Sequence, residues 1–325
     1  MMRREFIGLL GGAAAWPLPL RAQEAEPIRR IGVLIAIGED DPEARARVAA
    51  FEQGLRELGW ASGRNVRIAY RYAGGSADRA RSHAAELAAM QPDVILANAS
   101  PVLAAVLRET RTIPVVFAQV ADPVGGGFVD SLARPGGNVT GFTTFEYSIG
   151  AKWLELLKEI APSITRVAVL RDPTFAAAAA QLGAIQAVAP AFGAQIIPVG
   201  VQDAAAIERA VDEFSRQPNG GLITLPSPLT TVHRDAIVAV AARHRLWAVY
   251  PYRYFAARGG LVSYGFDNID LFRRAASYVD RILRGRSRRT SRYRRRRSTS
   301  SSSTARPLRR SASRCRPRCS PALMR

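Results

Sequence analysis

The chain has 325 residues, and its formal net charge of +19 suggests at first a nucleic-acid-binding protein. Most of that charge sits at one end, because residues 286–325 hold 15 arginines and no acidic residue or lysine, whereas residues 23–285 carry only +2. A body this close to neutral excludes a broad basic face for nucleic acid. Both cysteines, Cys315 and Cys319, lie in the same end, which excludes disulfides and thiol chemistry from the body.

The first 22 residues have the layout of an export signal. A basic start at Met1–Glu5 is followed by the small, apolar stretch Phe6–Ala15, and the small residue Ala22 can precede a cleavage site. We therefore predict cleavage near Ala22 and a periplasmic location for the mature chain. Arg3-Arg4 resembles a twin-arginine signal, so the twin-arginine and the general secretory routes both stay open.

Short apolar runs alternate with segments of helical periodicity from residue 29 to 285, which predicts an α/β protein with parallel sheets. The runs predict ten strands, at Ile31–Ile37, Val66–Tyr72, Val94–Asn98, Val115–Ala118, Val139–Phe142, Val167–Leu170, Gln195–Val199, Leu222–Leu225, Leu246–Tyr250 and Leu261–Tyr264. Helices are predicted between them, at Pro42–Leu58, Ser76–Met90, Gly150–Ile160, Ala176–Phe192, Ala204–Arg216, Thr230–Arg245 and Leu271–Leu283. The pattern restarts near Gly141, so we expect two doubly wound lobes joined by a hinge. Residues 29–142 and 262–285 would form lobe 1, and residues 143–261 would form lobe 2.

Four of the apolar runs end in a small polar residue followed by proline, after which a helical pattern begins. These pairs are Ser100-Pro101, Asp122-Pro123, Asp172-Pro173 and Ser227-Pro228. Ser and Asp are good helix N-caps, and proline is tolerated at the first helical position. In a parallel sheet the four pairs would share the edge where open α/β sheets bind ligands. Helix N-termini also attract anions, although capping alone explains each pair.

Motifs that indicate catalysis or metal binding are absent from the sequence. His83, His233 and His244 lie in helical patterns among polar neighbours, and no zinc, nucleophile-elbow or Walker motif occurs. We therefore expect no catalytic residue, no metal and no cofactor.

Three carboxylates, Asp122, Asp172 and Asp267, are expected near the cleft. They could cap helices, bind a ligand ammonium group, or form the acid/base pair of a racemase-like or isomerase-like enzyme. Aromatic residues cluster at Tyr250–Phe255 and at Tyr264 and Phe266. They predict either packing within a lobe or an aromatic wall for a ring-bearing ligand.

Three segments carry a resemblance to a known family: Pro114–Ala118 with Asp122-Pro123, Ala133–Gly141, and Gly259–Gly265. They resemble ABC-transporter substrate-binding proteins of the tryptophan/tyrosine type, over about residues 30–285. The resemblance implies a type I periplasmic-binding fold and a monomer that captures a small solute, an amino acid or related carboxylate, and delivers it to a permease in the inner membrane. It also places the cleft at the strand ends. With Asp267, the candidate ligand-binding residues are Ser100, Asp122, Thr143, Asp172, Ser227, Tyr264 and Asp267.

The sequence departs from the family after Gly285, where an Arg/Ser-rich tail replaces the usual late strand and helix. Such a composition predicts disorder, and a basic tail could bind nucleic acid or anionic lipid. A frameshift is our preferred hypothesis. Codons for family-like peptides, read one base out of frame, reproduce Ser298–Thr304, Arg306–Ser313 and Leu323–Arg325. Sequencing of the locus tests the idea, because a neighbouring frame without a family-like peptide would end it.

Overall fold

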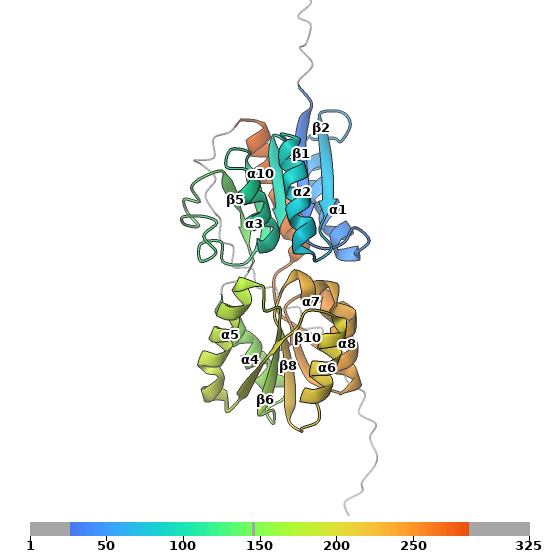
Figure 1. Cartoon of the computed structure of the whole chain (residues 1–325), viewed down its shortest axis with the longest axis vertical. Coiled ribbons are helices and arrows are strands. Elements are labelled where there is room, and N and C mark those ends of the chain that lie inside the picture. The colour runs from blue at the N-terminus through green and yellow to red at the C-terminus, as the bar shows by residue number, and fades with distance from the viewer. Residues whose placement is uncertain (1–26, 145–146, 286–325) are drawn as a thin grey trace, which may run out of the picture.

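Two lobes stacked along the long axis of the molecule make up the computed structural model, which describes residues 27–144 and 147–285 (Figure 1). Each lobe is a five-stranded parallel sheet with helices on both faces. The predicted signal (1–22) and the Arg/Ser-rich tail (286–325) lie outside the described residues, so their predictions stay untested.

The first sheet has the strand order β2-β1-β3-β4-β5. Its strands are β1 (Arg29–Ile35), β2 (Val66–Tyr72), β3 (Val94–Asn98), β4 (Val115–Val120) and β5 (Val139–Thr143). Helices α1 (Pro42–Glu57) and α10 (Asn268–Leu283) cover one face, and α2 (Ala77–Ala89) and α3 (Ser100–Glu109) cover the other. Because α10 packs against α1, the last described segment returns to the lobe in which the chain begins (Figure 1).

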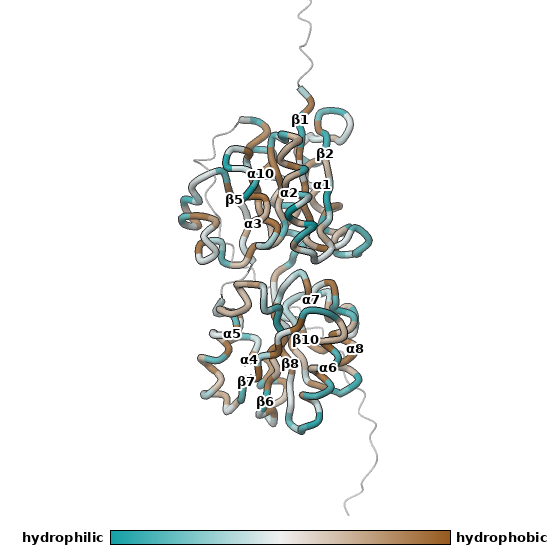
Figure 2. Tube along the Cα trace, in the orientation of Figure 1, coloured by the Kyte–Doolittle hydropathy of each residue, from teal (hydrophilic) through white to brown (hydrophobic). Residues whose placement is uncertain are grey.

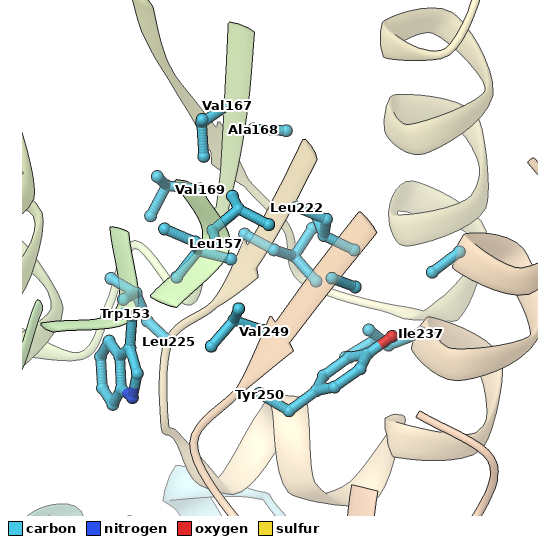
Figure 3. Close-up of a cluster of buried hydrophobic side chains, with 14 of the residues drawn as sticks. Trp153, Leu157, Val167, Ala168, Val169, Leu222, Leu225, Ile237, Val249 and Tyr250 are labelled. Carbon is cyan, nitrogen blue, oxygen red and sulfur yellow. The ribbon is translucent and has the colours of Figure 1, made fainter. Parts of the chain in front are cut away.

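The second sheet has the order β10-β9-β8-β6-β7. Its strands are β6 (Arg166–Arg171), β7 (Gln195–Gly200), β8 (Gly220–Thr224), β9 (Trp247–Tyr250) and β10 (Val262–Ser263). Its helices are α4 (Ile149–Ile160), α5 (Ala176–Val188) with the 3₁₀ turn η1 (Ala189–Phe192), α6 (Ala204–Phe214), α7 (Pro228–Val232), α8 (Arg234–Arg243) and α9 (Arg253–Ala257). Figure 3 shows part of the core of this lobe, where Trp153 and Leu157 of α4 pack near strand residues such as Val169 and Val249.

Burial on both faces explains why these segments became strands. All five residues of β3 are buried, and so are the middle four of β6. Hydrophobic stretches run through the interior of both lobes, and many of the outer loops are hydrophilic (Figure 2). Such continuous apolar runs are typical of parallel sheets sandwiched between helices. Among the described residues, no helix is both long and apolar enough to cross a membrane.

The predicted fold class is confirmed, and each of the ten strands lies within two residues of its predicted bounds. The expected helix Thr230–Arg245 is instead two helices, α7 and α8, which meet at His233. The pairings also place the crossings between lobes slightly differently from the expectation. Thr143 pairs in the first sheet, and Val262–Ser263 pair with β9 in the second.

Candidate functional site

A cavity lies between the two lobes, at the carboxyl ends of the strands, with about 390 Å³ of empty space that includes its opening to solvent. The first lobe contributes Ala36, Ile37, Arg47, Asn98, Ala99, Gln119, Ala121 and Thr144 to its lining. The second lobe contributes Phe175, Pro226, Ser227, Pro228, Thr231 and Tyr252. Ligands of open α/β sheets bind at this edge.

The backbone of the first lobe is strained where it meets the cavity. Ala99, Gln119 and Asp122 have φ angles of 72°, 62° and 34°, in the left-handed region that non-glycine residues avoid. Ala99 follows β3, and Gln119 lies at the register shift between β4 and β5. Strain of this kind costs about 1–3 kcal/mol per residue and is concentrated at functional sites.

Arg47 is the charged residue of the cavity lining. It lies on the inward face of α1 and is only 2% exposed. Its Nε and Nη2 atoms have no hydrogen-bond partner among the described residues, and a Glu43 carboxylate oxygen lies 4.0 Å from Nη2. A buried guanidinium stays protonated and is costly without an anion. The site can therefore hold a carboxylate, which matches the planar donor geometry of arginine.

A chain of hydrogen bonds runs from the first lobe across the cavity to the second. The backbone N–H of Ala36 donates to Asn98 Oδ1, and Asn98 Nδ2 donates to Gln119 Oε1 over 3.0 Å. Gln119 is in turn hydrogen-bonded to the side chain of Tyr252. Burial raises the pKa of Tyr252 to about 12, so its hydroxyl remains protonated at neutral pH.

The second lobe supplies an apolar wall and a helix end. Phe175 and Tyr252, which are 8% and 4% exposed, line the cavity beside Pro226. Ser227 caps α7 in a capping box with Thr230, in which the side-chain oxygen of each residue accepts from the backbone N–H of the other. This wall can pack against an apolar or aromatic group of a solute.

The lobes are also joined by an ion pair near the cavity. Arg234, on α8, donates to Asp41, the N-cap of α1, through Nη1 (2.7 Å) and Nη2 (3.1 Å). The two side chains are 6% and 12% exposed, respectively.

Of the four strand–proline pairs, one behaves as predicted. Ser227 caps a helix and lines the cavity. At Ser100 the helix begins, but the cap position is Ala99 and no side chain caps it. Asp172 instead accepts from the N–H and hydroxyl of Thr174, so Phe175 precedes α5. No helix follows Asp122 within the described part of the loop to β5; its carboxylate accepts from the Gly125 N–H.

The other predicted site residues are not in the lining of the cavity. Thr143 donates to the Val120 carbonyl, and its neighbour Thr144 is in the lining. The Tyr264 carbonyl accepts from Trp153 Nε1. Asp267 is exposed and caps α10. Among the described residues, Ser227 is thus the predicted residue that lines the cavity, and the ligand-binding roles of the other six stay predictions.

Most of the aromatic cluster packs within the second lobe. Tyr250 points into the core toward Ile237 (Figure 3), and its ring stacks on Phe255 at 5.0 Å. The Tyr254 hydroxyl is hydrogen-bonded to Thr231 at 2.9 Å. Tyr252 alone of this segment belongs to the lining. Within residues 27–144 and 147–285, no group of three or more His, Cys, Asp or Glu side chains could hold a metal ion.

The sequence reasoning missed Arg47 and Gln119. The sequence pattern could have indicated Arg47, because it shares the buried, apolar face of α1 with Ala44 and Phe51, and a charged residue on such a face is unusual. No sequence pattern indicated Gln119, because it faces the cavity only as a result of the register shift between β4 and β5.

Comparison with known proteins supports this architecture. A tyrosine-binding protein of Clostridioides difficile (strain R20291) is 25% identical over 238 residues, which is 73% of this chain and 68% of that protein. A conserved domain protein from Vibrio cholerae has a solved structure that is 26% identical, with a TM-score of 0.74 over 79% of this chain and 86% of that one. The structure of an ABC domain in complex with L-Trp from Streptococcus pneumonia shares the fold, at 21% identity and a TM-score of 0.73 over 79% and 85% of the two chains.

Residues 30–300 match the family described as ABC transporter substrate binding protein. The match starts where the resemblance was expected to start and runs past Gly285. It covers more than half of the chain and agrees with the two-lobed fold and the cavity between the lobes. The chain therefore belongs to the family of ABC transporter substrate-binding proteins.

Proposed function

We propose that this protein binds a small carboxylate-bearing solute between its lobes, as an exported monomer, and hands it to an inner-membrane permease. An amino acid with an aromatic or apolar side chain fits best. The relatives support this choice, since one is named for tyrosine binding and another was solved with L-Trp. The periplasm is the matching location, given the predicted signal.

The observation that carries the proposal is the buried guanidinium of Arg47 in the cavity lining, whose Nε and Nη2 make no hydrogen bond among the described residues. An arginine that is 2% exposed has already lost its water in the folded protein. An incoming carboxylate therefore gains a charge-assisted, bidentate contact while little further desolvation of the protein is required. Phe175 and Tyr252 provide apolar surface on the opposite lobe.

A catalytic role has less support. The carboxylates considered for an acid/base pair, Asp122, Asp172 and Asp267, are engaged in turns or at a helix end. None of them is in the lining of the cavity among the described residues. The geometry thus supports binding followed by release of an unchanged solute.

Thermal unfolding of the full chain tests the proposal. We expect L-tryptophan or L-tyrosine to raise the melting temperature, and tryptamine, which lacks the carboxylate, to leave it unchanged. The proposal fails if no amino acid or related carboxylate raises the melting temperature.

Two arginine variants on α1 test whether Arg47 binds the carboxylate of the solute and so anchors it. Arg47→Met should weaken binding of L-tryptophan roughly 30-fold or more, as loss of one partner of a buried charge pair does. Arg45→Met removes an exposed arginine from the same helix and should bind as the wild type does. Arg47→Met removes a buried charge with two unsatisfied donors, and Glu43 is exposed enough to reach water, so unfolding of the variant without solute should be no easier than that of the wild type. Equal affinities of the two variants would exclude Arg47 as the anchor.

A further inference from the structure

We propose that Asp41 and Arg234 form an ionic latch, which holds the two lobes closed and sets the rate of solute release without touching the solute. The predictions about solute release rest on the proposed function, whereas the prediction that the pair holds the lobes closed does not. The two residues lie 193 positions apart in the sequence, on α1 of the first lobe and α8 of the second.

Both partners are held in place by their own lobe before they meet. Asp41 Oδ1 accepts from the N–H of Glu43 at 2.9 Å, which fixes the carboxylate at the start of α1. Arg234 Nη1 also donates to the Thr231 carbonyl at 2.7 Å, and its guanidinium lies 5.8 Å from the ring centre of Tyr254. Side chains fixed in this way lose little conformational entropy when the pair forms, which is the main cost for mobile ion pairs.

In this structure the two lobes are in contact through the pair, and we call this the closed form; the pair is buried in it and is therefore sensitive to closure. The side chains are 6% and 12% exposed where the lobes meet. If one charge is removed, the other stays buried and unpaired in the closed form but regains water once the lobes separate. The cost of losing one partner therefore falls on the closed form and shifts the population toward the open one.

The position of the pair connects it to the cavity. Thr231, whose carbonyl accepts from Arg234, lines the cavity, and α1 carries Arg47 less than two helical turns beyond Asp41. Neither Asp41 nor Arg234 is itself in the lining. The latch therefore acts on how long the cavity stays shut.

Spin-label distances in the full chain without solute test the closure. Ala49 on α1 and Ala239 on α8 are exposed, so cysteines there can carry nitroxides once Cys315 and Cys319 are replaced by serine. Asp41→Asn keeps a helix N-cap while removing the charge. Asp40→Asn is the matched control, because it removes a fully exposed carboxylate that pairs with Arg45 in the same lobe.

We expect a population with the short distance in the wild type and in Asp40→Asn, and its loss in Asp41→Asn and Arg234→Gln. The double variant should recover part of the short-distance population, since it leaves no charge buried and unpaired in the closed form. The latch is refuted if Asp41→Asn retains the wild-type distance distribution, or if the wild type without solute shows only the long distance.

Rapid-mixing kinetics with L-tryptophan provide the second arm. Asp41→Asn should release it at least tenfold faster, with an association rate within about threefold of the wild type. A slower association with unchanged release would contradict the latch. If L-tryptophan fails to bind the wild type, the proposed function is wrong for this solute. The spin-label distances still test whether Asp41 and Arg234 hold the lobes closed.

Discussion

Asn98 Nδ2 donates a 3.0 Å hydrogen bond to Gln119 Oε1, and this contact holds the strained Gln119 against the cavity. Asn98 is fully buried, and its Oδ1 accepts from the Ala36 N–H. Asn98→Ala would leave that N–H unpaired in the interior, at a cost of about 1–3 kcal/mol in the free energy of unfolding. Urea denaturation measures this loss, and L-tryptophan titration should show weaker binding, because Gln119 no longer positions Tyr252.

Asn65 is a control for that change. It also makes two hydrogen bonds to backbone groups, with the Ala61 N–H and the Gly59 carbonyl, but before β2 and thus at the end of the sheet away from the cavity. Asn65→Ala should lower stability without affecting L-tryptophan binding. Equal binding by the Asn98 and Asn65 variants would show that the contact with Gln119 has no part in the site.

Two glycines should respond in opposite directions to replacement by alanine. A methyl group on Gly141, in β5, would overlap the backbone of Phe117 in the adjacent strand, so Gly141→Ala should destabilise the protein by several kcal/mol or prevent folding. Gly183, inside α5, has open space where the methyl group would go. Gly183→Ala should therefore raise the free energy of unfolding by about 0.5–1 kcal/mol. Urea denaturation of both variants measures the contrast, and a stable Gly141→Ala protein would contradict the close approach of the two strands.

The fold could be predicted from the sequence because its central strands are buried on both sides. Runs such as Val94–Asn98 and Val167–Leu170 are continuous and rich in Val, Ile and Leu, a pattern typical of parallel strands that helices cover on both faces. Their alternation with helical segments then implies parallel sheets. Local patterns of this kind are complete within ten or fifteen residues, so distant contacts do not alter them.

The site was harder to predict because it depends on competition among local hydrogen bonds and on contacts between lobes. Asp172 was a reasonable helix cap, but its carboxylate bonds Thr174 first, and Phe175 becomes the cavity residue. The pair of Asp41 and Arg234 joins residues 193 positions apart, and no local pattern contains such information. Ser227 was predictable because its capping box is local.

Glu43 should make stability depend on pH in mildly acidic solution. Burial raises the pKa of Glu43 above its ordinary value near 4.5, despite the opposing effect of Arg47. Above that ordinary value the unfolded chain has lost the proton while the folded protein keeps it. Stability must therefore fall as the pH rises from about 4.5 toward the folded-state pKa, and remain lower beyond it. In Glu43→Gln this fall is absent, so the variant should match or exceed the wild type at pH 7.

Urea midpoints between pH 4 and pH 7 measure the Glu43 effect. Glu213 is an exposed carboxylate on α6, and Glu213→Gln should give a profile parallel to that of the wild type. A Glu43→Gln profile that is also parallel would mean that the nearby arginines offset the effect of burial on the Glu43 pKa.

The last described helix is tied to the first lobe by Trp60, whose indole N–H donates to Asp280 at 2.9 Å across 220 positions of sequence. Trp60→Phe keeps most of the ring but removes the donor to a carboxylate that is 7% exposed, so it should cost about 1.5–3 kcal/mol. The cost comes from leaving Asp280 less satisfied, and replacing both partners should therefore recover part of it. Arg284, the other partner of Asp280, is half-exposed and can turn to water. We expect Trp60→Phe with Asp280→Leu to unfold at a higher urea concentration than Trp60→Phe alone. A double variant that is less stable by the sum of the two single losses would show that the two side chains act independently.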